Sequence, residues 1–106
     1  MVNMDMSEEA VYELINRRRR QILIHSIIYY KMNENVVTDD VWASWAVELE
    51  ELQKRYPEIA AKVPYADDFE DFDHSSGYNL PLDDPDAVFK ARYILQLHKQ
   101  RISEGM

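Results

Sequence analysis

The stretch that decides the fold is "IIYYKMNENVVTDDVWASWAVELEELQKRYPEI", residues 27–59. It contains the end of one helix, a short polar turn and a second helix that a proline stops. Thr38 is a good N-cap for the second helix, because its hydroxyl can accept a hydrogen bond from a free backbone N–H of the first turn. Pro57 lacks an N–H and cannot continue a helix smoothly. The stretch therefore predicts a helical hairpin whose second helix spans residues 39–55.

Apolar residues recur at helical spacing on both sides of this turn. No glycine or proline interrupts residues 8–32, which predicts a long first helix. Its start has two alternative caps, Ser7 or the pair of Asp5 and Glu8 at capping-box spacing. The predicted apolar face of the first helix consists of Val11, Leu14, Ile15, Ile22, Leu23, Ile27, Tyr29 and Tyr30. That of the second helix consists of Trp42, Trp45, Leu49 and Leu52.

A long acidic connection and a third helix complete the chain. Residues 65–83 carry too many apolar anchors for a free linker, so we expect an ordered loop that packs over the helices. These anchors are Tyr65, Phe69, Phe72, Tyr78 and Leu80. Asp84 and Pro85 predict the start of a third helix at residues 85–102. Its expected apolar side consists of Val88, Tyr93, Leu95 and Ile102. We therefore predict an all-α domain, a helical hairpin plus a C-terminal helix with a long ordered acidic loop.

Length and composition limit the class of protein. We expect residues 1–106 to form one domain. The absence of cysteine removes disulfides, a thiol nucleophile and thiolate metal sites. Residues 1–9 lack the basic segment and apolar core of a signal peptide, and the apolar run at residues 22–30 is too short to cross a bilayer. We therefore expect a soluble, cytoplasmic protein without a membrane partner.

The net charge of −8 is concentrated in the middle of the chain. Residues 39–86 carry fourteen acidic and three basic side chains, whereas residues 87–106 carry one acidic and four basic ones. An acidic surface repels phosphates, so we expect no direct contact with nucleic acid and instead a protein partner. The four arginines at residues 17–20 cover a full helical turn. They are either a solvated segment or a docking surface for a partner or a phosphate.

The other polar motifs offer no catalytic or metal-binding pattern. The neighbouring Asp, His and Ser of residues 73–75 do not make a triad, which needs convergent geometry. A calcium loop of the EF-hand kind needs glycine and glutamate where this chain has Ser76 and Leu82. His25 and His98 lack the spacing of metal-binding helices, so we expect them to be structural.

The opening stretch resembles a known module. Between residues 29 and 58 the chain shows Tyr-Tyr, Thr-Asp, Trp, Glu-Leu, Leu and Pro-Glu in that order. This pattern is similar to the small N-terminal helical domain of bacterial NAD-dependent DNA ligases. That domain has a helix ending in paired tyrosines or Tyr-His, a turn, and a helix that begins Ser/Pro-Asp-x-x-Tyr-Asp and stops at His-Pro-Glu-Leu. The spacing from Tyr29 to Pro57 fits without a gap and covers about a third of the chain.

The resemblance implies a ligand site. In those ligases the domain closes over the nicotinamide mononucleotide half of NAD, using stacked aromatic rings and carboxylates. By resemblance, Tyr29 and Tyr30 occupy the paired aromatic positions, and Asp39 occupies the first carboxylate position. Trp42 stands where the ligases have tyrosine, and Ala43 stands where they have a second aspartate. The implied cofactor is NAD or nicotinamide mononucleotide.

The chemistry of the ligases is absent from this chain. Nucleotidyl transfer needs a lysine nucleophile followed by x-Asp-Gly, and no lysine here has that context. We therefore expect no enzyme but a non-catalytic binding or adaptor protein, a stand-alone relative of the ligase domain. It would bind a nicotinamide nucleotide or a protein, and one way to act would be to inhibit a ligase by taking the place of its own domain. Such a free-standing copy would suit a phage or mobile-element genome.

An alternative comes from a different class of protein. An acidic inhibitor that imitates nucleic acid could occupy the basic channel of a nuclease or defence protein, as anti-restriction and anti-CRISPR proteins do. The carboxylates that would form its phosphate-like row are Asp67, Asp68, Glu70, Asp71, Asp73, Asp83, Asp84 and Asp86. Partner binding that weakens steeply with salt favours this alternative. Salt-insensitive binding that is lost on mutating Trp42 favours the ligase-like module.

Overall fold

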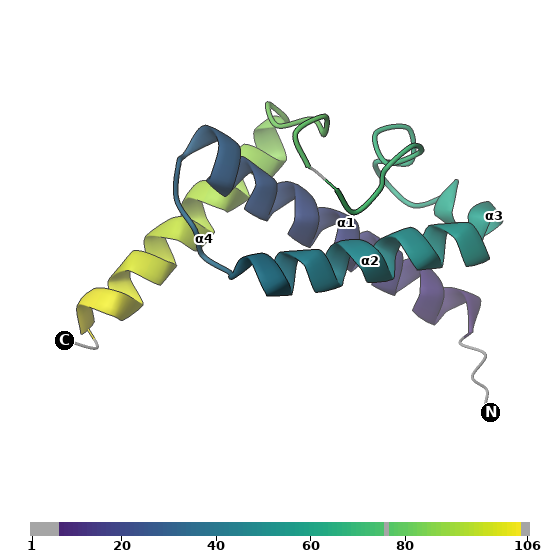
Figure 1. Ribbon diagram of the computed structural model, residues 1–106, viewed down its shortest axis with the longest axis horizontal. Helices are drawn as coiled ribbons and strands as arrows, with labels where there is room; N and C mark the ends of the chain where they lie inside the picture. The colour runs from purple at the N-terminus through teal and green to yellow at the C-terminus, as the bar shows by residue number, and fades with distance from the viewer. Residues whose placement is uncertain (1–6, 76, 105–106) are drawn as a thin grey trace.

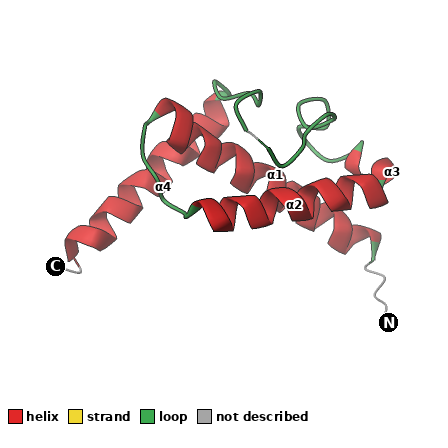
Figure 2. Ribbon diagram, in the orientation of Figure 1, coloured by secondary structure: helices red, strands yellow, loops and turns green. Residues whose placement is uncertain are grey.

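The computed structural model describes residues 7–75 and 77–104, and within them the chain forms helices and no strands (Figures 1 and 2). The helices are α1 (Glu8–Lys31), α2 (Asp39–Arg55), the short α3 (Pro57–Ala60) and α4 (Pro85–Glu104). The predicted all-α class, hairpin and C-terminal helix are confirmed. The bounds expected from the sequence differ from these by at most two residues.

Each long helix begins at a side-chain cap. The oxygens of Ser7, Thr38 and Asp84 each accept a hydrogen bond from the backbone N–H three residues further on, at 3.1, 3.3 and 3.0 Å. These bonds satisfy backbone donors that have no partner within the helix. Asp5, the alternative cap of the first helix, lies outside the described residues.

Helix α1 is the central element. It contacts α2, α3 and α4, whereas α2 and α4 make no contact with each other in the described structure. Figure 1 shows α2 running alongside α1 and α4 crossing α1 near its C-terminal end. The second half of α1 is therefore covered from two sides, which explains why its sequence is apolar nearly all round.

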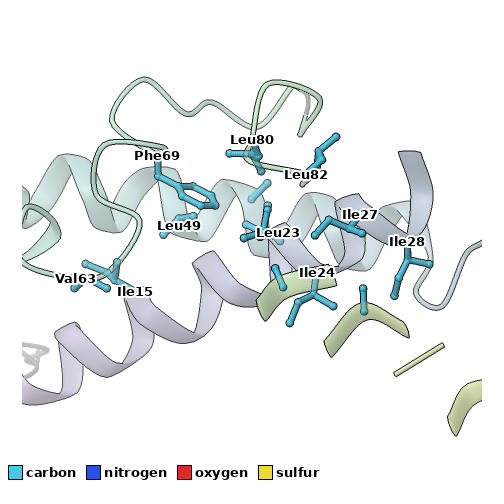
Figure 3. Packing of buried hydrophobic residues seen from close by; sticks show 14 of the residues in the cluster. Ile15, Leu23, Ile24, Ile27, Ile28, Leu49, Val63, Phe69, Leu80 and Leu82 are labelled. Carbon is cyan, nitrogen blue, oxygen red and sulfur yellow. The ribbon is translucent and has the colours of Figure 1, made fainter. Parts of the chain in front are cut away.

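The core is built around this half of α1 (Figure 3). Its buried residues are Val11, Ile15, Ile22, Leu23, Ile24, Ile27, Ile28, Ala46, Leu49, Ala60, Val63, Phe69, Leu80, Leu82, Ala87 and Ala91. Trp42, Trp45 and Leu52 are half-buried and pack against it. The connection after α3 contributes Phe69 and Leu80, as the sequence predicted.

Two parts of the predicted core are wrong. Tyr29 and Tyr30 do not lie in the core of the hairpin, because they are 52% and 39% exposed. On α4, Tyr93 and Ile102 are also exposed, and Ala87 and Ala91 make the buried contact with α1 instead. The two alanines allow close packing of the helices. Figure 1 shows that the C-terminal part of α4 projects beyond the other helices, and Ile102 in this helix is 53% exposed.

Arg19 is a buried structural residue, so neither a solvated segment nor a docking surface describes it. The residue is 2% exposed, and its guanidinium group donates to the carbonyl oxygens of Ala60, Val63 and Pro64 at 3.0, 2.9 and 3.1 Å. It also donates to Oε1 of Gln53 at 2.8 Å. Burial lowers the pKa of Arg19 to about 10, so the group stays charged at pH 7. The arginine thus ties the end of α3 to α1.

The other three arginines also interact with side chains of this chain. Arg17 pairs with Glu13 one turn earlier, at 2.9 Å. Arg18 pairs with Glu48 of α2. Arg20 donates to Asn16 and lies 5.5 Å from the ring centre of Tyr65.

Within the described residues, no helix combines the length and the apolar character needed to cross a membrane.

Candidate functional site

A pocket of about 290 Å³ lies where the end of α1 meets the start of α2. Residues from α1, the turn, α2 and the connection before α4 surround it. They are His25, Ser26, Tyr29, Tyr30, Glu34, Asn35, Val36, Val37, Thr38, Asp39, Trp42, Ala43, His74 and Ser75. All four residues that the sequence predicted as a cofactor site, Tyr29, Tyr30, Asp39 and Trp42, line this one pocket.

Exposed tyrosines surround part of the pocket. The rings of Tyr29 and Tyr30 meet edge to face with centres 4.9 Å apart. Tyr78, from the acidic connection, lies against Tyr30 in a similar geometry at 5.4 Å. Side chains at successive positions of a helix do not normally share a face, so the partly exposed Tyr78 helps hold this cluster together. It places aromatic surface where solvent can reach it, as a ligand site requires.

The deeper wall is formed by Trp42 and Ser26. The indole Nε1 of Trp42 donates to the hydroxyl oxygen of the buried Ser26 at 3.3 Å. Gly77 lies directly on this pair, because a Cβ at its position would stand 2.2 Å from Ser26 Oγ and 3.2 Å from Trp42 Cζ2. Close approach of the backbone therefore requires a glycine at this position.

The acidic connection reaches the pocket through His74. Its backbone N–H and its ring Nδ1 both lie 2.9 Å from Oε1 of Glu50, and Lys54 donates to the other oxygen at 2.9 Å. The hydrogen bonds from Lys54 and His74 lower the pKa of Glu50 to about 2. Asp73 accepts hydrogen bonds from the hydroxyl of Ser75 and, at 2.8 Å, from its backbone N–H, which close the turn and lower the pKa of the Asp73 carboxyl. The ring of His74 bonds to Glu50 and not to Asp73 or Ser75, so the three residues do not form a triad.

His25 lies in the wall of the pocket and makes no hydrogen bond with the described chain. Its ring packs against Trp45 with centres 5.4 Å apart and a tilt of 49°. The Nδ1 atom is buried and has no hydrogen-bond partner. Burial lowers the pKa of His25, so the ring is neutral at pH 7.

Two carboxylates give the pocket its charge. Asp39 is the first residue of α2, and Glu34 in the turn pairs with Lys99 of α4 at 3.2 Å. Ala43, also in the lining, contributes no polar group. Together with the tyrosines and Trp42, this arrangement suits a flat aromatic ligand with a positive charge or hydrogen-bond donors. It contains no activated nucleophile paired with a base.

The eight acidic residues of the alternative site lie in two groups. Asp67, Asp68, Glu70, Asp71 and Asp73 follow α3, whereas Asp83, Asp84 and Asp86 stand at the start of α4. Figure 1 shows these two segments as separate lobes of the connection. All eight are exposed except Asp84, which caps α4 and accepts a hydrogen bond from the Tyr65 hydroxyl at 3.0 Å. Asp84 therefore serves the fold.

The comparisons with known proteins add no relative. No protein-family model matches this chain, and the search found no match among curated proteins or solved structures. The resemblance to the ligase domain therefore stays a hypothesis that rests on residues 29–58. Among the described residues, no group of three or more histidine or carboxylate side chains is placed to hold a metal ion.

Among the pocket residues that sequence reasoning did not assign to a site are His25, His74 and Ser75. His25 stands four residues before Tyr29, on the same face of a helix. That spacing was a usable signal, but a lone histidine on an apolar face is more often structural. His74 and Ser75 had no such signal, because the path of a long loop is set by contacts distant in sequence.

Proposed function

We propose that this chain is a non-catalytic binding module whose pocket takes the nicotinamide end of a pyridine nucleotide. One observation carries the proposal: four residues named from a sequence pattern line a single pocket at the hairpin turn. Two of them, Tyr29 and Tyr30, are partly exposed and are not buried in the core. The ring of Tyr29, which is 52% exposed, can therefore contact a ligand.

The chemistry of the pocket supports this ligand. The oxidised nicotinamide ring is flat and positively charged, and such rings are attracted both to aromatic faces and to carboxylates. Tyr29, Trp42 and Asp39 supply these two kinds of group. The volume of about 290 Å³ is at the low end for ligand pockets, which run from roughly 300 to 1,000 Å³. It therefore suits half of a dinucleotide better than the whole.

The proposal is tested by a two-dimensional NMR titration of the labelled protein with nicotinamide mononucleotide and with NAD. Shifts are expected at Tyr29, Tyr30, Asp39 and Trp42. An Asp39→Asn variant should bind at least about tenfold more weakly, the scale of a lost charge-assisted hydrogen bond.

A matched control is available one residue further along. Asp40 also lies in the first turn of α2, where a negative charge favours the positive end of the helix, but it does not line the pocket. Asp40→Asn should therefore destabilise α2 as much as Asp39→Asn does and leave the affinity for the ligand unchanged. If no NMR signal of the wild-type protein shifts at millimolar ligand, the proposal is wrong.

The acidic inhibitor is kept as a second candidate because seven of its eight carboxylates are exposed. A chain that imitates nucleic acid must compete with duplex DNA for a DNA-binding nuclease, and this competition must weaken steeply with salt. Replacing Asp67 and Asp71 with asparagine should then abolish the competition. Failure to displace DNA from a panel of restriction nucleases would remove this candidate.

A further inference from the structure

His25 combines three properties that a purely structural residue does not need. It lines the pocket, its ring is fixed against Trp45, and it makes no hydrogen bond to the described chain. Buried polar atoms normally have partners. Its Nδ1 is a buried side-chain atom for which the described residues supply none.

The burial of Nδ1 decides where the ring carries its proton. A neutral imidazole has one N–H and one bare nitrogen. A buried N–H without an acceptor is the rarer and costlier arrangement, so the bare nitrogen belongs at Nδ1. The N–H is then at Nε2, the other ring nitrogen of this pocket-lining residue. His25 thus offers the pocket one neutral hydrogen-bond donor.

The groups around His25 determine which acceptor this donor suits. Asp39 of α2 and Glu34 of the turn bring negative charge to the same pocket, and Lys99 of α4 is bonded to Glu34. His74, the titratable residue that the loop contributes, is bonded to Glu50. A further carboxylate brought by a ligand would meet repulsion here. A neutral carbonyl oxygen would not.

We propose that His25 recognises the carboxamide on the ligand's ring, so that the pocket selects nicotinamide mononucleotide over its acid form, nicotinic acid mononucleotide. This inference rests on the proposed function. The Nε2–H of His25 donates to the carbonyl oxygen of the amide, and the acid form loses that neutral contact and is repelled by Asp39. His25 is therefore a specificity-determining residue.

The test measures the affinity of both mononucleotides by calorimetry at pH 7.5, with wild-type protein and two variants. Wild type should bind the amide form at least about tenfold more tightly, the scale of one hydrogen bond with its desolvation. His25→Phe keeps a ring against Trp45 but removes the donor, so the preference should shrink. His25→Gln restores an N–H donor at similar reach, so the preference should return.

Measuring the preference for the amide form at several pH values gives a further test, because this preference would not change with pH if the role of His25 were only structural. Protonated His25 can pair with a carboxylate, so the preference for the amide should decrease as the pH falls from 7.5 to 5. In His25→Gln the preference should stay constant over this range. Equal affinity of wild type for both forms would overturn this inference and leave the proposed function intact. Binding of neither form would overturn both.

Discussion

Replacing Arg19 with methionine is expected to destabilise the fold by about 3 kcal/mol, because three backbone carbonyls and Gln53 then lose a charged donor. Methionine matches the length of the arginine stem but cannot donate. At this chain length such a loss lowers the Tm by roughly 12–24 °C. Thermal unfolding followed by circular dichroism measures it.

The matched control is Arg17→Met, two residues earlier on α1. Arg17 makes an exposed pair with Glu13, and exposed pairs contribute about 0–1 kcal/mol. Its loss should shift the Tm by only a few degrees. Equal effects of the two substitutions would show that the buried bonds of Arg19 do not hold α3 to α1.

Gly77→Ala is expected to lift the loop away from the pocket wall. The new Cβ would meet Ser26 Oγ at 2.2 Å, and overpacking of this kind costs about 1–3 kcal/mol. Urea unfolding measures the loss. Adding Ser26→Ala removes the clashing oxygen, so the double variant should recover part of the stability. Strictly additive losses would mean that the loop moves for another reason.

At the scale of whole elements, most of the fold could be predicted because its signals are local. Thr38 and Asp84 bond to N–H groups three residues away, so a cap and its helix are visible in one short window. Tyr29, Asp39 and Trp42 line the same pocket because the two helices form a hairpin whose turn is only a few residues long. That is why the predicted ligand residues meet at one pocket.

The contacts that could not be predicted connect elements distant in sequence. Arg19 bonds to carbonyls more than forty positions later, and His74 reaches back to Glu50. The run of four arginines does not by itself show which of them points inward. In this chain Arg19 stands four residues from both Ile15 and Leu23, on the buried face, and this spacing was the available signal.

The bond between the loop and α2 gives a prediction about pH. The pKa of Glu50 falls from its usual 4.5 to about 2 in the folded chain. A lowered carboxyl pKa stabilises the fold above the unfolded value, and this contribution is lost as the pH falls through the folded value. Wild type should therefore be more stable than Glu50→Gln at pH 6, and the difference should shrink from pH 4.5 towards pH 2.

Urea unfolding of both proteins at pH 6, 4 and 3 measures this difference. His74→Ala removes the ring donor but keeps the backbone N–H, so it should reproduce only part of the effect of Glu50→Gln. A stability difference that does not change with pH would contradict the assignment of Glu50 as the titrating group.

At the scale of the whole molecule, α1 is stable only because it is covered on two sides. Helix α2 covers one side, and α4 covers another without touching α2. Figure 3 shows Ile24 and Ile28 beside the ribbon of α4, and both are buried. A hairpin of α1 and α2 alone would expose them. The pocket at the end of α1 therefore depends on a helix that contributes none of its lining.

Ending the chain after Asp84 tests this dependence. Exposing one isoleucine costs about 1.5–3 kcal/mol, and a domain is stable by only about 5–15 kcal/mol in total. Loss of α4 uncovers Ile24 and Ile28 together and removes the buried Ala87 and Ala91. Residues 1–84 should therefore show no cooperative thermal transition by circular dichroism.

A chain ending after Gln100 is the control for this truncation. It lacks only the projecting end of α4, where Ile102 is 53% exposed, and it keeps the pair between Lys99 and Glu34. Its Tm should stay within a few degrees of wild type. If residues 1–84 instead unfolded cooperatively with native helix content, the hairpin would be an independent module, and α4 would be free to serve a partner.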